Sequence, residues 1–436
     1  MTGPERYDVL VAGGGSAGVG AALGAARQGA RVGLVEAAGC LGGAATMRNV
    51  LTYCGLYTLG ERPQQAVAGV AEEVMARLRR WGAVTPPQRH RGVFVVFDPE
   101  GVKRALDELC REAGVEVLLH SFVAAARREG GLVRSVEVAD HSGLRSLEAA
   151  AFVDASGDCD LAHFAGASTR YGNNGAVNLG TLGTRFGGVA PGAEVSAEAV
   201  TRAVEAAMAR GVGPLTKKRS VVTRLPISGD VVCYLASERY DPRDALGMSR
   251  AEMDGRAQAW AYLEALRALP GWERAYLAST GPDFGTRESR HIDGRLQLSW
   301  QDITAGRRFE DAVALGAWGV EWHDRETLES SFIYPPGRER EGGGTYDIPL
   351  RCLISADTPN LFAAGRTADG DREAGASLRV MGTAFATGQA AGVAAALLAD
   401  GGGGPGGADP AEVRRVLAAQ GAILDPASMP PPLMAG

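Results

Sequence analysis

The stretch from Tyr7 to Glu36 constrains the fold of this chain more than any other. It reads as an apolar strand, a glycine-rich turn, an alanine-rich helix, a second strand and an acid, with G-x-G-x-x-G at Gly13, Gly15 and Gly18. The first glycine permits a tight turn, the second lets a pyrophosphate approach the backbone, and the third lets the helix pack closely on the sheet. The helix N-terminus then faces the phosphates, and Glu36 can accept hydrogen bonds from ribose hydroxyls. This order predicts a dinucleotide-binding Rossmann unit; a glycine-rich turn of another α/β protein is the alternative.

Strand and helix patterns continue beyond this unit. Asp98 followed by Pro99 is typical of an N-cap and the first residue of a helix. Three short segments separated by the turns at 129–131 and 141–143 predict a small antiparallel meander. The predicted strands are residues 7–12, 31–36, 93–97, 115–120, 122–126, 133–139, 144–150, 152–155 and 360–364, and the predicted helices are 64–81, 98–113, 195–210, 249–268, 306–315, 382–398 and 410–420.

The middle of the chain departs from regular βαβ alternation. Residues 172–345 mix helices with short β-segments, which predicts an inserted α+β domain that binds substrate. We therefore predict an α/β fold in which residues 1–171 and 346–400 form one discontinuous Rossmann-like domain. Residues 401–436, which begin with the glycine-rich run 401–407, are predicted to be a linker and tail.

Composition and charge indicate which classes of binding partner this chain is not expected to have. The net charge is −6 and the basic run at 217–219 is short, which argues against nucleic acid as a partner. The first apolar run is already the Rossmann strand and no apolar run reaches membrane-spanning length, so we expect neither a signal peptide nor a membrane partner. The six cysteines form no C-x-x-C pair and no Cys/His ligand spacing, which argues against a metal site and favours reduced thiols and a cytoplasmic location.

Four segments together resemble FAD-dependent oxidoreductases of the two-dinucleotide-binding-domain class, of the fumarate-reductase-like and heterodisulfide-reductase-A-like type. Besides the opening turn with Glu36, they are Leu41–Thr46, Phe152–Ala162 followed by Ala165-Gly166, and Asn360–Arg366 continuing through Arg379–Thr383 to Gly388–Gly392. The resemblance implies a glutathione-reductase-type domain with a β-meander, FAD bound in an extended form, and a helix N-terminus near Met381 that stabilises the reduced flavin. The cofactor-binding residues that it implies are Gly13, Gly15, Ser16, Ala17, Gly18, Glu36, Gly42, Gly43, Thr46, Val123, Ala155, Gly157, Gly365, Arg366, Met381, Gly382 and Thr383.

The same resemblance directs attention to side chains near the flavin. Relatives of this subgroup often carry Thr-His-Glu-Ala where this chain has Asp-Arg-Glu-Ala at 371–374, so Arg372 stands in place of a histidine. Arginine stays protonated and is a poor base, but it can bind a carboxylate or stabilise an enolate. The candidates for catalysis or substrate binding are Arg372, Arg379, His323, Arg351 and Arg287, with His291 and Tyr346 as further candidates; for each the alternative is a structural role.

We expect hydride transfer between flavin N5 and a small organic substrate, which the arginines would favour as an anion. No second G-x-G-x-x-G follows a strand, so a dedicated NAD(P)H domain is not expected. A flavin monooxygenase or reductase that uses free NAD(P)H, and a non-catalytic FAD-binding scaffold, are the alternatives. A homo-oligomer is compatible with the sequence, which names neither the substrate nor the electron acceptor.

Overall fold

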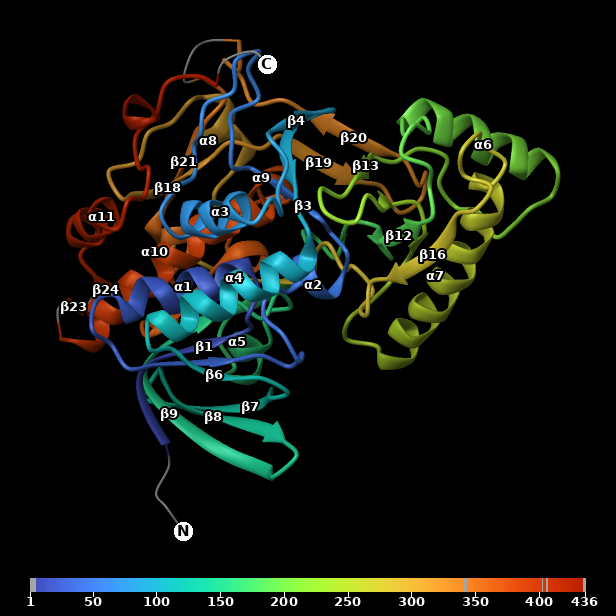
Figure 1. Cartoon of the computed structure of the whole chain (residues 1–436). Coiled ribbons are helices and arrows are strands. Elements are labelled where there is room, and N and C mark those ends of the chain that lie inside the picture. Colours follow the sequence, from blue (N-terminus) through green and yellow to red (C-terminus); the bar gives the residue numbers. More distant parts are fainter. Residues whose placement is uncertain (1–4, 340–342, 402, 405–406, 434–436) are drawn as a thin grey trace.

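A computed structural model describes residues 5–339, 343–401, 403–404 and 407–433 (Figure 1). Its main sheet has seven strands in the order β6-β2-β1-β9-β8-β7, and β22 pairs with β9 off this path. The strands are β1 (Glu5–Ala12), β2 (Val32–Val35), β6 (Glu116–Leu118), β7 (Phe122–Glu129), β8 (Leu132–Asp140), β9 (Gly143–Asp154) and β22 (Leu361–Ala363). β6, β2, β1, β9 and β22 are parallel, and β7, β8 and β9 form an antiparallel meander.

β9 belongs to both parts of this sheet. Its first half pairs with β8 in the meander, and its second half pairs with β1 and β22 in the parallel part. The sequence predicted two strands here, 144–150 and 152–155, and that prediction was wrong because the chain stays extended through Ala151. The pairing of Phe152 with Leu361 brings the last third of the chain against the first.

Four helices cover one face of the sheet (Figure 1). They are α1 (Ser16–Ala26), α3 (Val70–Arg80), α4 (Pro99–Glu112) and α10 (Met381–Ala399). The predicted cap of α4 is confirmed, because Asp98 accepts hydrogen bonds from the backbone N–H groups of Glu100 and Gly101 at 3.0 and 3.4 Å. α3 begins at Val70 rather than at residue 64 because Gly69 lies at φ 60°, outside the helical region.

α10 is long and apolar enough to cross a membrane, which corrects the expectation that no apolar run reaches that length. It has 19 residues and a mean hydropathy of 1.3 in its apolar window. That window is 78 % buried inside the protein, where α10 packs on α1. Burial of this kind is what a core helix of the main domain requires.

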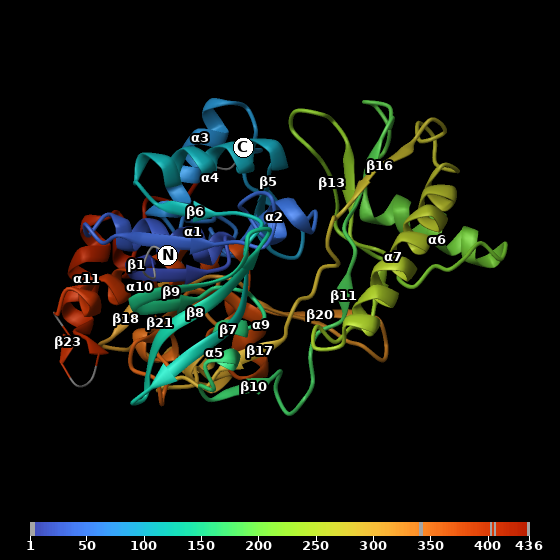
Figure 2. The same cartoon turned by 90° about the horizontal axis from the view of Figure 1, so that it is seen from below.

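A second group of elements lies to one side of the main sheet (Figures 1 and 2). Helices α6 (Ala197–Ala209) and α7 (Ala245–Leu266) pack beside a four-stranded sheet in the order β13-β14-β12-β16. Its strands are β12 (Thr184–Gly187), β13 (Val222–Arg224), β14 (Val231–Cys233) and β16 (Tyr276–Thr280). These elements have a hydrophobic core of their own, which includes Phe186, Tyr262 and Trp272.

Not all of the predicted inserted region 172–345 belongs to that core. Ile292 and Val313 lie within this range but pack into the cores of the main domain. The predicted helix 306–315 is wrong, because β18 (Ala312–Gly316) forms there and pairs with β21 (Tyr346–Pro349). All five residues of β18 are buried, and periodicity alone does not distinguish such a short apolar run from a helix.

Short elements complete the described chain. Within the predicted linker, Gly403–Gly404 pairs with Gly407–Ala408, while residues 402 and 405–406 of the linker and 434–436 of the tail lie outside the described residues. The remaining elements are α2 (Ala44–Met47), α5 (Asp160–Phe164), α8 (Trp300–Thr304), α9 (Arg372–Leu378), α11 (Pro410–Ala419), β3 (Thr52–Cys54), β4 (Gln88–Arg89), β5 (Val93–Val96), β10 (Thr169–Tyr171), β11 (Gly180–Thr181), β15 (Ser237–Glu238), β17 (Arg290–Ile292), β19 (Val320–His323), β20 (Ser330–Ile333) and the 3-10 turns Leu350–Cys352, Gly365–Thr367 and Pro426–Ser428.

Candidate active-site cavity

A cavity of about 780 Å³ runs from the main sheet to α6. At one end it is lined by Gly13, Ala155 and Ala364, which directly follow β1, β9 and β22. The carboxyl ends of parallel strands are where open α/β sheets bind their ligands. At the other end the lining comes from the second group of elements and consists of Ala197, Glu198, Thr201, Arg202, Lys217, Arg219, Ser220 and Val221.

The glycine-rich turn forms the first end of the cavity. Gly13 lies at φ 95°, in the left-handed region, and a Cβ on Gly18 would overlap the carbonyl oxygen of Gly13. A Cβ on Gly15, in contrast, would meet nothing closer than the Cα of Gly43 at 3.8 Å, so Gly15 leaves open space beside the helix N-terminus. In that first turn, the buried hydroxyl of Ser16 finds no hydrogen-bond partner within the described part of the chain. A helix N-terminus with an open face and a free hydroxyl is a ready site for phosphate.

Glu36 lines the cavity and also holds the turn in place. Its carboxylate accepts hydrogen bonds from the backbone N–H groups of Gly14 at 2.6 Å and Ala38 at 2.7 Å. A carboxylate has about four acceptor positions, so it retains capacity for ribose hydroxyls.

Two arginines converge on Thr286 at the cavity wall. Arg48 and Arg366 each donate a hydrogen bond to Oγ1 of Thr286 at 2.8 Å, and Arg366 also pairs with Asp158 at 3.1 Å. Burial, followed by the charge of Arg366, lowers the pKa of Arg48. Two buried guanidinium groups at this spacing repel each other, so an anion between them is favoured. Sequence reasoning missed Arg48, although it directly follows the loop 41–46 assigned to the cofactor.

Most of the residues that the resemblance assigned to FAD line this cavity, and five do not. Thr46 donates its hydroxyl to the carbonyl of Leu41 at 2.8 Å and so holds the loop from behind. Val123 points into the core under the meander, where it is 7 % exposed. The five residues that the cavity lining leaves out are Gly18, Thr46, Val123, Gly382 and Thr383.

The backbone at the start of α10 explains why Gly382 is missing from the cavity lining. A Cβ on Gly382 would overlap the carbonyl of Cys54, so this residue faces β3 rather than the cavity. Met381 and Ala384 line the cavity, which leaves the uncapped N-terminus of α10 beside it. Of the three residues predicted at this helix end, Met381 therefore lines the cavity, and Gly382 and Thr383 do not.

The far end of the cavity brings together ionisable side chains, of which Lys217 and His323 are buried and the others are half-buried. Nζ of Lys217 lies 3.4 Å from Nδ1 of His323, and Nε2 of His323 lies 3.6 Å from Oε1 of Glu321. Arg379 donates to the backbone carbonyl of Glu321 at 2.8 Å, and Arg287 donates to Oγ1 of Thr181 at 2.7 Å. All five ionisable residues line the cavity, and three of them, His323, Arg287 and Arg379, are candidates from the sequence.

Burial and mutual repulsion change the protonation of this cluster. Burial, and then the charge of Arg287, lowers the pKa of Lys217 to about 7. Burial, and then the charges of Arg287 and Lys217, holds the pKa of His323 well below its ordinary value. Burial and the charge of Arg379 lower the pKa of Arg287 to about 10. This end of the cavity therefore attracts an anion and offers neutral nitrogen atoms for proton transfer.

Two of the predicted catalytic side chains lie outside the cavity. Arg351 pairs through two hydrogen bonds of 2.9 and 3.0 Å with Asp311, and 46 % of its side chain is exposed. The guanidinium of Arg372 stacks over the ring of Trp322, at 4.0 Å from its centroid. Neither residue lines the cavity, so the structure does not bring them together with the other candidates, and their catalytic role stays a prediction. The sequence pattern at 371–374 indicates a segment close to the cavity, but it does not indicate the direction in which the side chain of Arg372 points.

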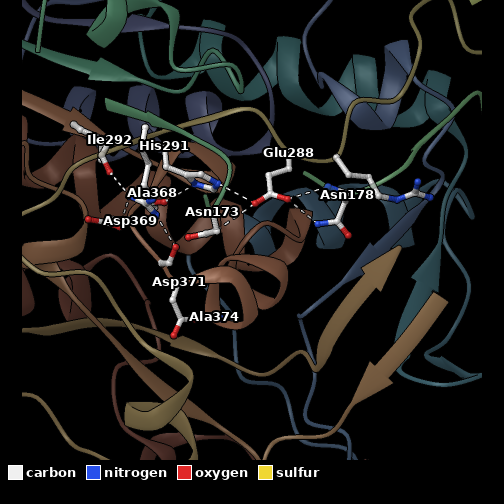
Figure 3. Close-up of polar contacts among 12 residues, drawn as sticks. Asn173, Asn178, Glu288, His291, Ile292, Ala368, Asp369, Asp371 and Ala374 are labelled. Carbon is white, nitrogen blue, oxygen red and sulfur yellow. Dashed lines mark hydrogen bonds and ion pairs between the residues drawn. The ribbon is translucent and has the colours of Figure 1, made fainter. Parts of the chain in front are cut away.

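His291 takes part in a buried network behind the cavity (Figure 3). Its Nε2 lies 3.3 Å from Oε1 of Glu288, and its Nδ1 lies 3.1 Å from the carbonyl oxygen of Ala368. The other carboxylate oxygen of Glu288 accepts hydrogen bonds from the backbone and side-chain N–H groups of Asn178 at 3.0 and 2.9 Å. Oδ1 of Asn178 in turn accepts from the backbone N–H of His323 at 2.8 Å. The network supports the backbone of a cavity residue.

The candidate Tyr346 is structural in this arrangement, and the cavity cysteine Cys54 is inert. The hydroxyl of Tyr346 bonds to that of Ser377 at 2.6 Å, inside the core. Cys54 lines the cavity, but burial strongly raises the pKa of its thiol, so a thiolate is disfavoured. All six cysteines are unpaired.

Comparisons with known proteins found a matching family model and several similar solved structures. The model of the family described as FAD dependent oxidoreductase matches residues 8–417. Similar solved structures include a geranylgeranyl bacteriochlorophyll reductase-like protein from Thermoplasma acidophilum (12 % identity, 96 % of this chain and 84 % of that one, TM-score 0.48) and BexE, described in studies of oxidation during BE-7585A biosynthesis (15 %, 95 % and 69 %, 0.49). A third is CabE, an aromatic hydroxylase from angucycline biosynthesis (17 %, 95 % and 68 %, 0.47). No curated protein sequence matches this chain.

Proposed function

This chain belongs to the family of FAD-dependent oxidoreductases, and on that premise we propose that it transfers a hydride between N5 of FAD and a small organic anion. The observation that carries the proposal is the continuity of the cavity. One end has the phosphate-binding turn, and the other has Lys217, Arg287, His323 and Arg379. Both ends therefore share one cavity.

The residues at the first end suit FAD. The open face at Gly15, the unpartnered hydroxyl of Ser16 and the N-terminus of α1 would hold the pyrophosphate. Glu36 would accept from the adenosine ribose, and Arg48 and Arg366 would neutralise phosphate charge. When bound, FAD supplies two-electron redox chemistry at N5 of its ring.

The side chains at the far end would bind and orient the substrate. Arg287 and Arg379 are half-buried cations whose hydrogen bonds in the described structure go to neutral oxygen atoms rather than to carboxylates. A substrate carboxylate would therefore gain charge-assisted hydrogen bonds in a low-dielectric space. Trp318 and Phe332 line the same cavity and would exclude water from the reacting carbon.

Purified protein tests the proposal directly. We expect visible flavin absorbance that is released on denaturation, and bleaching of that absorbance on anaerobic mixing with a small organic anion that carries an oxidisable C–H bond. Protein without flavin, or flavin that no such anion reduces, would contradict the proposal. Rapid bleaching by NADPH alone would instead favour the alternative of an NAD(P)H-using monooxygenase or reductase.

A further inference from the structure

Lys217 differs from the other lysines of this chain. The chain has three lysines, and two of them face carboxylates, with Lys103 at 2.8 Å from Glu100 and Lys218 at 3.8 Å from Glu205. In the described part of the chain, no carboxylate lies within 4 Å of Nζ of Lys217. The residue is only 7 % exposed and lines the cavity. A lysine without a counter-ion in such a place is costly, which points to a function for its amine.

The main chain of Lys217 is held rigidly. The hydroxyl of Tyr262, on α7, accepts a hydrogen bond from the backbone N–H of Lys217 and donates one to its carbonyl, both at 2.7 Å. Tyr262 is fully buried in the core of the second group of elements. The amine therefore extends into the cavity from a fixed position, as a catalytic group requires.

The groups that face this amine come from several elements. His323 from β19 is its nearest polar neighbour, at 3.4 Å, and its backbone is held by Asn178. The charges that act on Lys217 are those of Arg287 and Arg91, which disfavour its protonated form, and of Glu321 and Glu329, which favour it. Burial has the largest effect, so the balance leaves the amine uncharged for much of the time near neutrality.

We propose that Nζ of Lys217 is the catalytic base that accepts a proton from the substrate. The substrate class that fits this role is a small carboxylate with a hydroxyl or amino group on the carbon that is oxidised. In this step the O–H or N–H proton moves to Nζ, the C–H hydride leaves with its electron pair to oxidised FAD, and a C=O or C=N bond forms. The lysine ends as an ammonium ion, and loss of this proton to water as the product leaves restores the amine. The inference rests on the proposed function, which supplies the oxidant.

His323 completes the arrangement as a positioning residue. Its imidazole stays neutral because the pKa of this side chain lies well below its ordinary value, through burial and then the charges of Arg287 and Lys217. A neutral Nδ1 at 3.4 Å can hold the lysine amine by one hydrogen bond and leave its lone pair or remaining protons for the substrate. The carboxylate of the substrate would lie toward Arg287 and Arg379.

Nuclear magnetic resonance of the FAD-loaded protein labelled with ¹³C at lysine Cε tests the charge state. Three lysines give three signals, which single Lys→Arg variants assign. We expect one signal to titrate near pH 7, to disappear in Lys217→Met, and to be unaffected in Lys218→Met. If all three signals titrate in the ordinary range of lysine, near pH 10, the inference is overturned.

Anaerobic flavin bleaching tests the catalytic role, with lactate, malate, alanine and aspartate as probes. We expect Lys217→Met to bind FAD normally and to slow bleaching by about 100-fold or more, with recovery when methylamine is added to Lys217→Ala. Lys218→Met, which changes an exposed neighbour, should keep the wild-type rate. A wild-type rate in Lys217→Met overturns the inference while leaving the proposed function intact. If none of the probes bleaches the wild-type flavin, the assigned substrate class is wrong, and the proposed function fails if other small organic anions do not bleach it either.

Discussion

A Cβ atom on Gly388 would overlap the carbonyl oxygen of Ala17. The same relationship recurs one turn later, between Gly392 and Ala21, so α1 and α10 run parallel with their backbones in contact. Because the helices are parallel, both N-termini lie at the same end, where Ser16 and Met381 line the cavity. The close approach of two helices thus places two positive helix ends at one site.

Replacement of Gly388 by Ala should destabilise the protein by about 1–3 kcal/mol, because the added methyl group forces the two helices apart. Urea unfolding of the FAD-free protein measures this loss. Gly192→Ala is the matched control, since a Cβ at Gly192 meets nothing within 4 Å, and it should change stability by roughly 0.5 kcal/mol or less. Equal stabilities for the two variants would contradict the close contact.

Gly15→Val should weaken FAD binding without unfolding the protein. The backbone of Gly15 is extended, at φ −73°, and its Cβ direction is open, so the side chain would occupy the space beside the α1 N-terminus. We expect the Kd for FAD to rise by about tenfold or more, which corresponds to roughly 1.4 kcal/mol. Flavin titration and thermal unfolding of the same preparation separate the two effects. A normal Kd would show that the pyrophosphate lies elsewhere.

The pKa of Lys217 predicts how stability depends on pH. Since its folded pKa is about 7 and that of an unfolded lysine is near 10.5, the unfolded chain binds the extra proton between these values. Wild-type stability relative to Lys217→Met should therefore fall as pH decreases from about 10.5 to 7, by several kcal/mol at most, and then level off. Urea unfolding of both proteins across this range measures the difference. A constant difference would mean that the buried amine stays charged.

Glu288→Gln should lower stability by about 1–3 kcal/mol at neutral pH, because it removes the charge from a buried, hydrogen-bonded carboxylate. Burial alone would raise the pKa of Glu288. The hydrogen bond and charge of His291 and the hydrogen bonds of Asn178 outweigh burial and lower this pKa overall. A lowered carboxylate pKa adds stability above the unfolded value of about 4.3, and this contribution is lost as pH falls through the folded value. The difference in stability between wild type and Glu288→Gln should thus shrink in acid. Urea unfolding of both proteins at neutral and at acidic pH checks this, and an unchanged difference would contradict it.

Arg351→Ala and Arg372→Ala should retain the wild-type rate of flavin bleaching, because neither side chain lines the cavity. Arg379→Ala removes a cation from the cavity wall. This variant should slow flavin bleaching or raise the substrate concentration that gives half of the maximal bleaching rate. Arg351→Ala should still cost about 1–3 kcal/mol of stability, since it leaves the buried carboxylate of Asp311 unpaired. A large loss of rate in Arg372→Ala at normal FAD content would show that its side chain reaches the substrate after all.

The sequence alone determined the parts of this protein that depend on neighbouring residues. The turn from Gly13 to Gly18 and the Asp98 cap were readable because their chemistry lies within a few residues of chain. The short run 312–316 was misread, since a buried strand and a buried helix look alike at that length.

Only the tertiary structure decided which charged groups share the cavity. Lys217 and Arg287 lie in loops and His323 lies at the end of β19, each more than thirty residues from the next in the chain, and no local pattern relates them. Conversely, Arg372 is close in sequence to Arg379 but points to Trp322 instead of the cavity. Burial and repulsion arise from packing between distant segments, and these set the protonation of Lys217 and the chemistry that it can perform.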